Sequence, residues 1–161
     1  MKAKRQRVLA LFLFFLLVFS VAYLGSLFTQ TSVQSWYLAL QKASWNPPAW
    51  VFAPVWIVLY GIIAYAGWLV YIKDYSYQRT RALRVFVLQL LMNLLWSFLF
   101  FYLRSPIAAF FDILVLVIFI IWMIYSFWPI SRKAALLLIP YLLWVIYAAT
   151  LNAAICFMNK I

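Results

Sequence analysis

This chain of 161 residues contains no histidine, one cysteine (Cys156) and only two carboxylates, Asp74 and Asp112. These numbers exclude a disulfide within the chain, a cluster of metal ligands, a Ser-His-Asp triad and a catalytic pair of carboxylates. The three glycines form no phosphate-binding loop. Proton-coupled transporters usually need several ionisable groups within the membrane, and only Asp112 lies inside an apolar run. Conventional enzymes and pumps are therefore disfavoured.

Charge is also scarce, since charged residues make up 9% of the chain and apolar residues 70%. A water-soluble domain of this size could not carry that composition on its surface. The apolar runs are unbroken rather than alternating, which favours helices over a membrane β-barrel, and each is near the ~20 residues that cross a bilayer. The sequence predicts an all-α integral membrane bundle of five transmembrane helices. A single domain would cover residues 1–161, with spans near 8–28, 48–72, 82–103, 106–128 and 134–158.

The first span follows a basic start and so resembles a signal peptide, with residues 20–22 as a small-residue cleavage site. Its apolar run continues to Phe28, which is the length of a full span, and we expect the helix to be retained. Prolines predict features of two later spans. The second begins near Pro48, and bends are expected at Pro54 and Pro140.

The thirteen Lys and Arg give the chain a net charge of +11, and they gather at the ends of the spans. That distribution favours membrane lipids over nucleic acid as the partner of these charges. Ten of the cations lie on the side that holds the N-terminus and three on the other side. The excess predicts a cytoplasmic N-terminus and an outside C-terminus in a plasma membrane.

Aromatic and polar side chains recur at spacings of three or four residues, which places them on common helix faces. These faces carry Phe52, Trp56 and Tyr60 in the second span, Gln89, Asn93, Trp96 and Phe100 in the third, and Pro140, Trp144, Ala148 and Asn152 in the fifth. Such faces can wall a cavity for a flat, largely apolar ligand. The alternative is dense packing, which more often explains such stripes. We expect the small residues Ala64 and Gly67 to serve close helix packing, and a homodimer is compatible with the sequence.

Asp112 lies about two turns into the fourth span, which is ~9 Å along the helix axis. An ionisable side chain there should face the bundle interior and find a partner. It could contact a ligand or a gate, or it could form a structural hydrogen bond with Arg104, Gln89 or Asn93. We favour the structural bond, because polar side chains commonly join transmembrane helices.

The first loop and the second span carry a specific pattern: Trp36-Tyr37, Lys42-Ala43-Ser44-Trp45-Asn46-Pro47-Pro48, Pro54-Val55-Trp56 and Leu59-Tyr60. The later spans continue it with Gln89-Leu90, Asn93, Trp96, Phe100-Phe101, Asp112-Ile113-Leu114, Pro140-Tyr141-Leu142, Trp144 and Leu151-Asn152. In this order, and over nearly its whole length, the chain resembles the TspO/MBR family of tryptophan-rich sensory proteins and translocator proteins.

The resemblance implies a five-helix bundle whose ligand cavity is closed by the first loop. It implies ligands such as protoporphyrin IX, cholesterol for the mitochondrial members, and isoquinoline-carboxamide or benzodiazepine drugs. Some bacterial members break down protoporphyrin IX with light and oxygen, and the two tryptophans needed would correspond to Trp56 and Trp144. The implied ligand-binding residues are Tyr37, Pro47, Trp56, Gln89, Asn93, Trp96, Trp144 and Ala148.

Three functions stay open: a tetrapyrrole-binding sensor, regulator or carrier; a photo-oxidative porphyrin-degrading enzyme; and a sterol or lipid transporter. No cofactor is expected, and porphyrin would be ligand or substrate. Free porphyrin is favoured over haem because the chain has no histidine to coordinate iron. The sequence departs from the family pattern at Ala43, where proline is usual, and at Ala153, where the proposed sterol motif has tyrosine. The second departure argues against sterol recognition through that motif.

Overall fold

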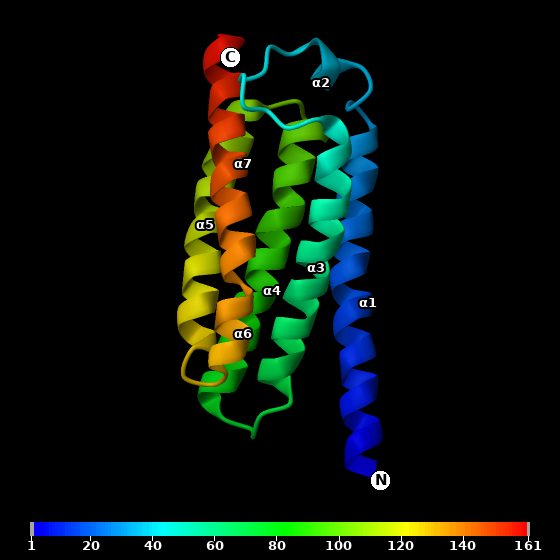
Figure 1. Ribbon diagram of the computed structural model, residues 1–161, viewed down its shortest axis with the longest axis vertical. Coiled ribbons are helices and arrows are strands. Elements are labelled where there is room, and N and C mark those ends of the chain that lie inside the picture. Colours follow the sequence, from blue (N-terminus) through cyan, green and yellow to red (C-terminus); the bar gives the residue numbers. More distant parts are fainter. Residues whose placement is uncertain (1, 161) are drawn as a thin grey trace.

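The computed structural model describes residues 2–160. Within them the helical segments follow in the order α1 (Lys2–Gln30), α2 (Trp36–Ala39), α3 (Ala49–Tyr71), α4 (Tyr77–Ser97), η1 (Phe98–Tyr102), α5 (Pro106–Phe127), α6 (Arg132–Leu137) and α7 (Ile139–Met158). They build five rods, because η1 continues α4 and α6 leads into α7 (Figure 1). All five rods are long and apolar enough to cross a membrane. The predicted all-α bundle of five transmembrane helices is confirmed.

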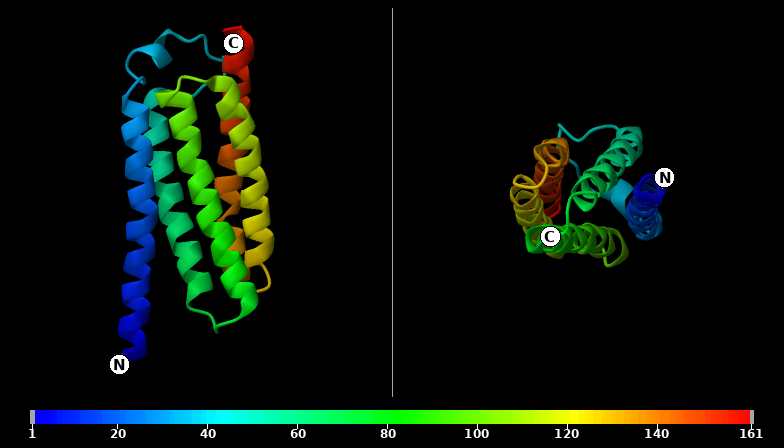
Figure 2. Two further views of the ribbon diagram at one scale, coloured as in Figure 1. Left: turned by 180° about the vertical axis from the view of Figure 1, so that it is seen from behind. Right: turned by 90° about the horizontal axis from the view of Figure 1, so that it is seen from below.

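The rods stand side by side, and the loop that contains α2 covers the end of the bundle opposite the N-terminus (Figures 1 and 2). Helix α4 packs against α5, and α5 packs against α7. Helix α1 lies at the edge against α3 and α4, and its first turns project beyond the α3–α4 connection (Figure 1). Large apolar side chains such as Phe12 and Leu16 are exposed on its outer face. A lipid environment removes the cost of exposing them to water.

The N-terminal boundary of α4 differs from the predicted span start at residue 82. The helix begins at Tyr77 because the hydroxyl oxygen of Ser76 accepts the backbone N–H of Arg79 at 3.1 Å and so caps the first turn. Arg79, Arg81 and Arg84 therefore belong to the helix and not to the preceding loop.

The two prolines predicted to bend helices have different effects. Pro54 lies inside the continuous helix α3. The fifth rod is interrupted at Leu138, between α6 and α7. Pro140 explains this break, because it has no N–H for the carbonyl one turn earlier and its ring crowds that turn.

The half of the bundle nearest the N-terminus is densely packed with buried apolar side chains, among them Val18, Ile63, Phe86, Ile120, Met123 and Phe127. Gly67 is the point of closest approach there. A Cβ atom at this residue would lie 2.7 Å from Cε2 of Phe86 and 2.9 Å from Cε1 of Phe14. Ala64, one turn away, is fully buried. Both small residues thus serve packing between helices of one chain, as predicted.

The Gly67→Ala variant is expected to destabilise the protein by about 1–3 kcal/mol, since overpacking forces rings off their preferred positions. Gly61→Ala is the matched control, because nothing lies within 4 Å of a Cβ built at Gly61. It should be neutral or stabilising, because alanine favours a helix over glycine. The midpoint of thermal unfolding in detergent measures both. Equal midpoints for the two variants would contradict the close contact at Gly67.

Candidate ligand-binding cavity

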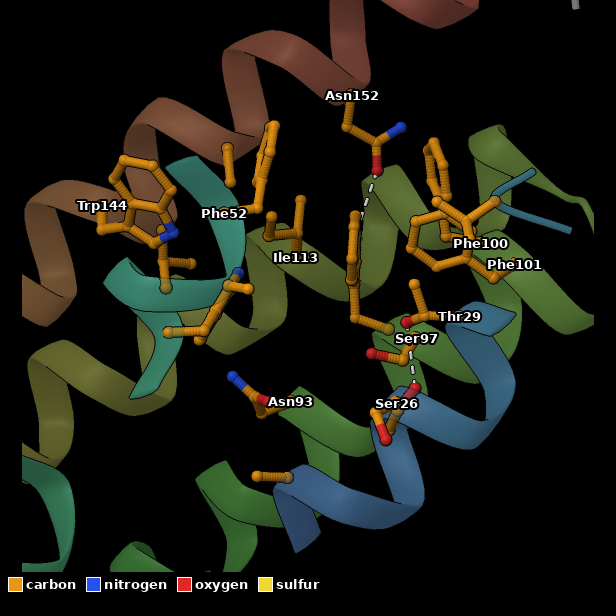
Figure 3. Close-up of a pocket in the computed structure, with 18 of the residues that line it drawn as sticks. Ser26, Thr29, Phe52, Asn93, Ser97, Phe100, Phe101, Ile113, Trp144 and Asn152 are labelled. Carbon is orange, nitrogen blue, oxygen red and sulfur yellow. Dashed lines mark hydrogen bonds between the residues drawn. The ribbon is translucent and has the colours of Figure 1, made fainter. Parts of the chain in front are cut away.

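A cavity of about 530 Å³ occupies the half of the bundle nearest α2. Its volume lies in the range of small-molecule sites, which are ~300–1,000 Å³. All five rods contribute to its wall, together with the first loop. Figure 3 shows side chains from these elements around a common space, including Ser26, Thr29, Phe52, Asn93, Ser97, Phe100, Phe101, Ile113, Trp144 and Asn152.

The wall is mainly aromatic because three helices turn aromatic faces toward the cavity. On α3 the spacing of four residues stacks Trp56 on Tyr60, with ring centroids 5.3 Å apart. Trp144 of α7 meets the ring of Phe52 edge to face at 6.0 Å. On the α4 rod, Trp96 stacks on Phe100 at 5.0 Å. These arrangements are the favourable ones for aromatic pairs, and they leave broad apolar faces around the cavity.

A chain of hydrogen bonds supports one end of the cavity. The Tyr60 hydroxyl donates to Oδ1 of Asn93 at 2.7 Å, and the Asn93 amide donates to the Tyr141 hydroxyl at 3.1 Å. The Tyr141 hydroxyl donates to Oε1 of Gln89 at 2.9 Å, and Gln89 donates to the carbonyl of Phe86 at 3.1 Å. Only Tyr60 and Asn93 line the cavity. The deeper members hold the Asn93 amide in one orientation, because each polar group is buried and bonded.

A second set of bonds joins three helices beside the cavity. Trp96 donates its indole N–H to Oδ1 of Asn152 at 3.1 Å, and the Asn152 amide donates to the carbonyl of Pro106 at 2.9 Å. The indole nitrogen of Trp144 is buried and has no hydrogen-bond partner in the described part of the chain. An unpaired buried donor of this kind costs free energy.

The first loop docks on the wall through the end of the α4 rod. In the π-helical segment η1, the N–H of Leu103 bonds the carbonyl of Phe98. The chain then leaves the helix, so the carbonyl of Phe101 is free for other donors. It accepts the Ser32 hydroxyl at 2.7 Å. The ring of Tyr37 packs edge to face on Phe101 at 5.7 Å.

Two further contacts hold the rest of the loop over the cavity. The Tyr147 hydroxyl donates to the carbonyl of Trp45 at 2.7 Å. The backbone of Gln41 and the side-chain amide of Asn159 exchange two bonds, of 2.9 and 3.0 Å. The loop is therefore joined to α7 at two points and covers this end of the cavity, as the resemblance implies.

The titratable side chains of the loop face partly buried surroundings. The Lys42 ammonium lies 4.6 Å from the centre of the Tyr37 ring and donates to the carbonyl of Leu40 at 3.0 Å. Burial lowers the pKa of Lys42. Burial raises the pKa of Tyr37, and a hydrogen bond with the side chain of Asn46 partly opposes that shift. Tyr37 therefore stays a neutral phenol around physiological pH.

The model of the TspO/MBR family matches residues 13–158. The chain belongs to this family. It is 40% identical to the tryptophan-rich protein TspO of Archaeoglobus fulgidus, over 96% of this chain and 99% of that protein. It is 34% identical to the translocator protein of Homo sapiens, over 81% of this chain and 78% of the human one. A tryptophan-rich sensory protein of Cereibacter sphaeroides is 34% identical, over 73% of this chain and 72% of its own.

The structure brings most of the residues that the TspO/MBR resemblance implied into one wall: Tyr37, Trp56, Asn93, Trp96, Trp144 and Ala148. Two do not line the cavity. Gln89 is fully buried one turn deeper, where it supports Asn93 through Tyr141. Pro47 lies in the loop, where its carbonyl accepts the side-chain amide of Asn46. The spacing of aromatic and polar residues had predicted three helix faces around a cavity. All residues of these faces line the wall except Gln89 and Pro140.

The expectation for Asp112 was right in orientation and wrong in partner. Its side chain is 7% exposed and so faces the interior. Its Oδ2 atom has no hydrogen-bond partner among the described residues. The expected partners Gln89 and Asn93 are committed to tyrosine hydroxyls, and Arg104 is exposed. Asp112 does not line the cavity.

Sequence reasoning missed the contribution of α1 to this TspO/MBR cavity. Ala22, Gly25, Ser26 and Thr29 line the wall. Their spacing of three and four residues, small or polar within an otherwise apolar run, is the signal that could have identified this face. Ile113 and Leu116 of α5 also line the wall. Their spacing does not distinguish them from other apolar residues of that span, although Ile113 belongs to the pattern that carries the family resemblance.

Proposed function

We propose that this protein binds a tetrapyrrole of the protoporphyrin IX type in the aromatic cavity and acts as a sensor, regulator or carrier. The cavity itself carries the proposal, since about 530 Å³ is enclosed by rings from α3, the α4 rod and α7. A flat, apolar macrocycle gains from offset and edge contacts with such rings.

Access from the membrane supports the same proposal. Phe19 of α1 and Ile57 of α3 both line the cavity, yet they are 37% and 59% exposed on the bundle. These two residues of the cavity wall are thus exposed on neighbouring helices of the bundle. A hydrophobic ligand dissolved in the bilayer could approach there without crossing the covered end.

The test is a titration of purified protein with protoporphyrin IX in a neutral detergent, followed by quenching of tryptophan fluorescence. We expect saturation near one ligand for each chain, because the aromatic side chains gather around a single cavity of about 530 Å³. Ferric haem should bind no tighter than the free porphyrin, since the chain has no histidine for the iron. Quenching that rises linearly without saturation would contradict a defined site.

A second candidate function is light- and oxygen-dependent breakdown of the bound porphyrin. One observation favours it: Trp56 and Trp144 both border the cavity. Indole rings are the most easily oxidised side chains available there, and they could exchange electrons with the excited macrocycle. Dioxygen would be the oxidant and would be consumed together with the porphyrin.

We also propose that the N-terminus is cytoplasmic and the C-terminus outside. The termini lie at opposite ends of the bundle (Figure 1), and the cations gather at the N-terminal end. In a bacterial inner membrane, a periplasm-dependent phosphatase reporter should be active when fused after Lys160 and inactive when fused before Lys4. The reverse pattern would overturn this orientation, and activity at both ends would contradict five spans.

A further inference from the structure

Besides the aromatic cavity, a groove of about 460 Å³ lies between α1 and α3 at the N-terminal end of the bundle. Its walls include Gln6, Arg7, Leu9, Leu13, Tyr71 and Ile72. It shares no residue with the aromatic cavity. One wall of the groove belongs to α1, the helix whose first turns project beyond the rest of the bundle (Figures 1 and 2).

Two contacts hold the walls of this groove in place. The indole N–H of Trp68 on α3 donates to the backbone carbonyl of Arg7 on α1 at 2.9 Å. The rings of Phe14 and Tyr71 pack with their centroids 5.5 Å apart. The first contact uses only the backbone of Arg7, so its exposed guanidinium is left free to meet a ligand.

One cation lines the groove, and a second lies against an aromatic ring of its wall. Arg7 forms part of one wall. The Arg79 guanidinium lies 5.5 Å from the centre of the Tyr71 ring, which forms the other wall. It is held there because Nη1 donates to the carbonyls of Tyr71 and Lys73 at 3.0 and 2.7 Å. The only acidic residue at this end is Asp74, which is exposed.

Other cations at the same end of the bundle form cation–π contacts with aromatic rings. Arg81 lies 5.8 Å from the centre of the Trp122 ring, and Lys133 lies 5.6 Å from that of Tyr65. Aromatic rings paired with Lys and Arg are typical of the interface between membrane and water. Contacts of this kind are expected at the level of lipid headgroups, at the same end of the bundle as the groove.

The order of side chains along α1 matches the order of groups in a phospholipid. Arg7 stands at the outer end of the groove, and Leu13 lies about 9 Å further into the bundle by helix rise. Leu9 and Leu13 are exposed, apolar and part of the wall. We propose that this groove is a binding site for an anionic phospholipid, with its phosphate at Arg7 near Arg79 and an acyl chain along Leu9 and Leu13.

The test compares phosphatidylglycerol with phosphatidylcholine, each added to purified protein in a neutral maltoside detergent, with dissociation constants from native mass spectrometry. Arg7→Gln removes the charge and keeps the backbone carbonyl that Trp68 binds. Arg5→Gln is the matched control, since it removes the same charge from the same helix outside the groove. Arg7→Lys keeps the charge. The unfolding midpoint without lipid shows that each variant is folded.

We expect wild type to prefer phosphatidylglycerol, and Arg7→Gln to weaken its binding about fivefold, the effect of one cation near an anionic lipid surface. Arg5→Gln and Arg7→Lys should stay within about twofold of wild type. Equal losses in Arg7→Gln and Arg5→Gln would show diffuse attraction and overturn the site. Equal binding of phosphatidylcholine, or binding of inorganic phosphate as tight as that of phosphatidylglycerol, would overturn it as well. None of these outcomes depends on whether porphyrin binds.

Discussion

Replacing Trp144 by alanine is expected to weaken binding of protoporphyrin IX by about 5- to 150-fold. The indole lies in the cavity wall, packed edge to face on Phe52 and against Tyr147. A large aromatic side chain buries ~150–250 Å². Losing a substantial part of that contact with the ligand costs about 1–3 kcal/mol of binding free energy, which gives the stated range. The dissociation constant from fluorescence quenching measures the effect.

Trp128→Ala is the control for this variant. Trp128 follows the last residue of α5, is 45% exposed and lies under the Arg132 guanidinium at 5.7 Å. It does not line the cavity, so its loss should leave the dissociation constant unchanged. Because both variants remove one indole, the quenching of each is compared with its own starting fluorescence. Similar losses of affinity in both would mean that porphyrin partitions into detergent instead of binding in the cavity.

The Trp56→Phe variant is expected to keep most of its affinity for protoporphyrin IX and to lose most of any light-driven degradation. Phenylalanine keeps an apolar ring beside Tyr60, so the cost in binding should stay below ~1.5 kcal/mol, as for a tolerated change of core volume. Phenylalanine is much harder to oxidise than tryptophan, so electron exchange with the excited macrocycle would be lost. Absorbance of the porphyrin and chromatography of the product, in light and in darkness, separate the two effects.

Trp128→Phe removes an indole outside the cavity and should degrade porphyrin at the wild-type rate. Samples without oxygen should show no product in any variant, because dioxygen is the proposed oxidant. If the Trp56→Phe protein binds and bleaches porphyrin as wild type does, the loss of porphyrin in light is ordinary photobleaching and is not catalysed through Trp56. Of the two candidate functions, only porphyrin binding as a sensor, regulator or carrier would then be left.

Much of this fold could be predicted from the sequence because the membrane imposes a strong and local constraint. Every spanning segment must be apolar over ~20 residues and satisfy its own backbone hydrogen bonds, so apolar runs alone indicate five helices. Helical periodicity then assigns residues to faces without knowledge of the neighbours. Phe52, Trp56 and Tyr60 follow one another at the spacing of one helix turn, and all three line the cavity.

Tertiary structure alone decided how far each face reaches into the cavity. Gln89 and Asn93 share a face of α4, yet only Asn93 reaches the cavity, because Tyr141 of α7 fills the space beside Gln89. The docking of the loop also depends on tertiary structure, because the Ser32 hydroxyl binds the carbonyl of Phe101, which is left free where η1 ends. The groove beside Arg7 exists only because α1 packs at the edge of the bundle. Periodicity says which residues share a side of a helix, but the side chains of the other helices determine which of them meet a ligand.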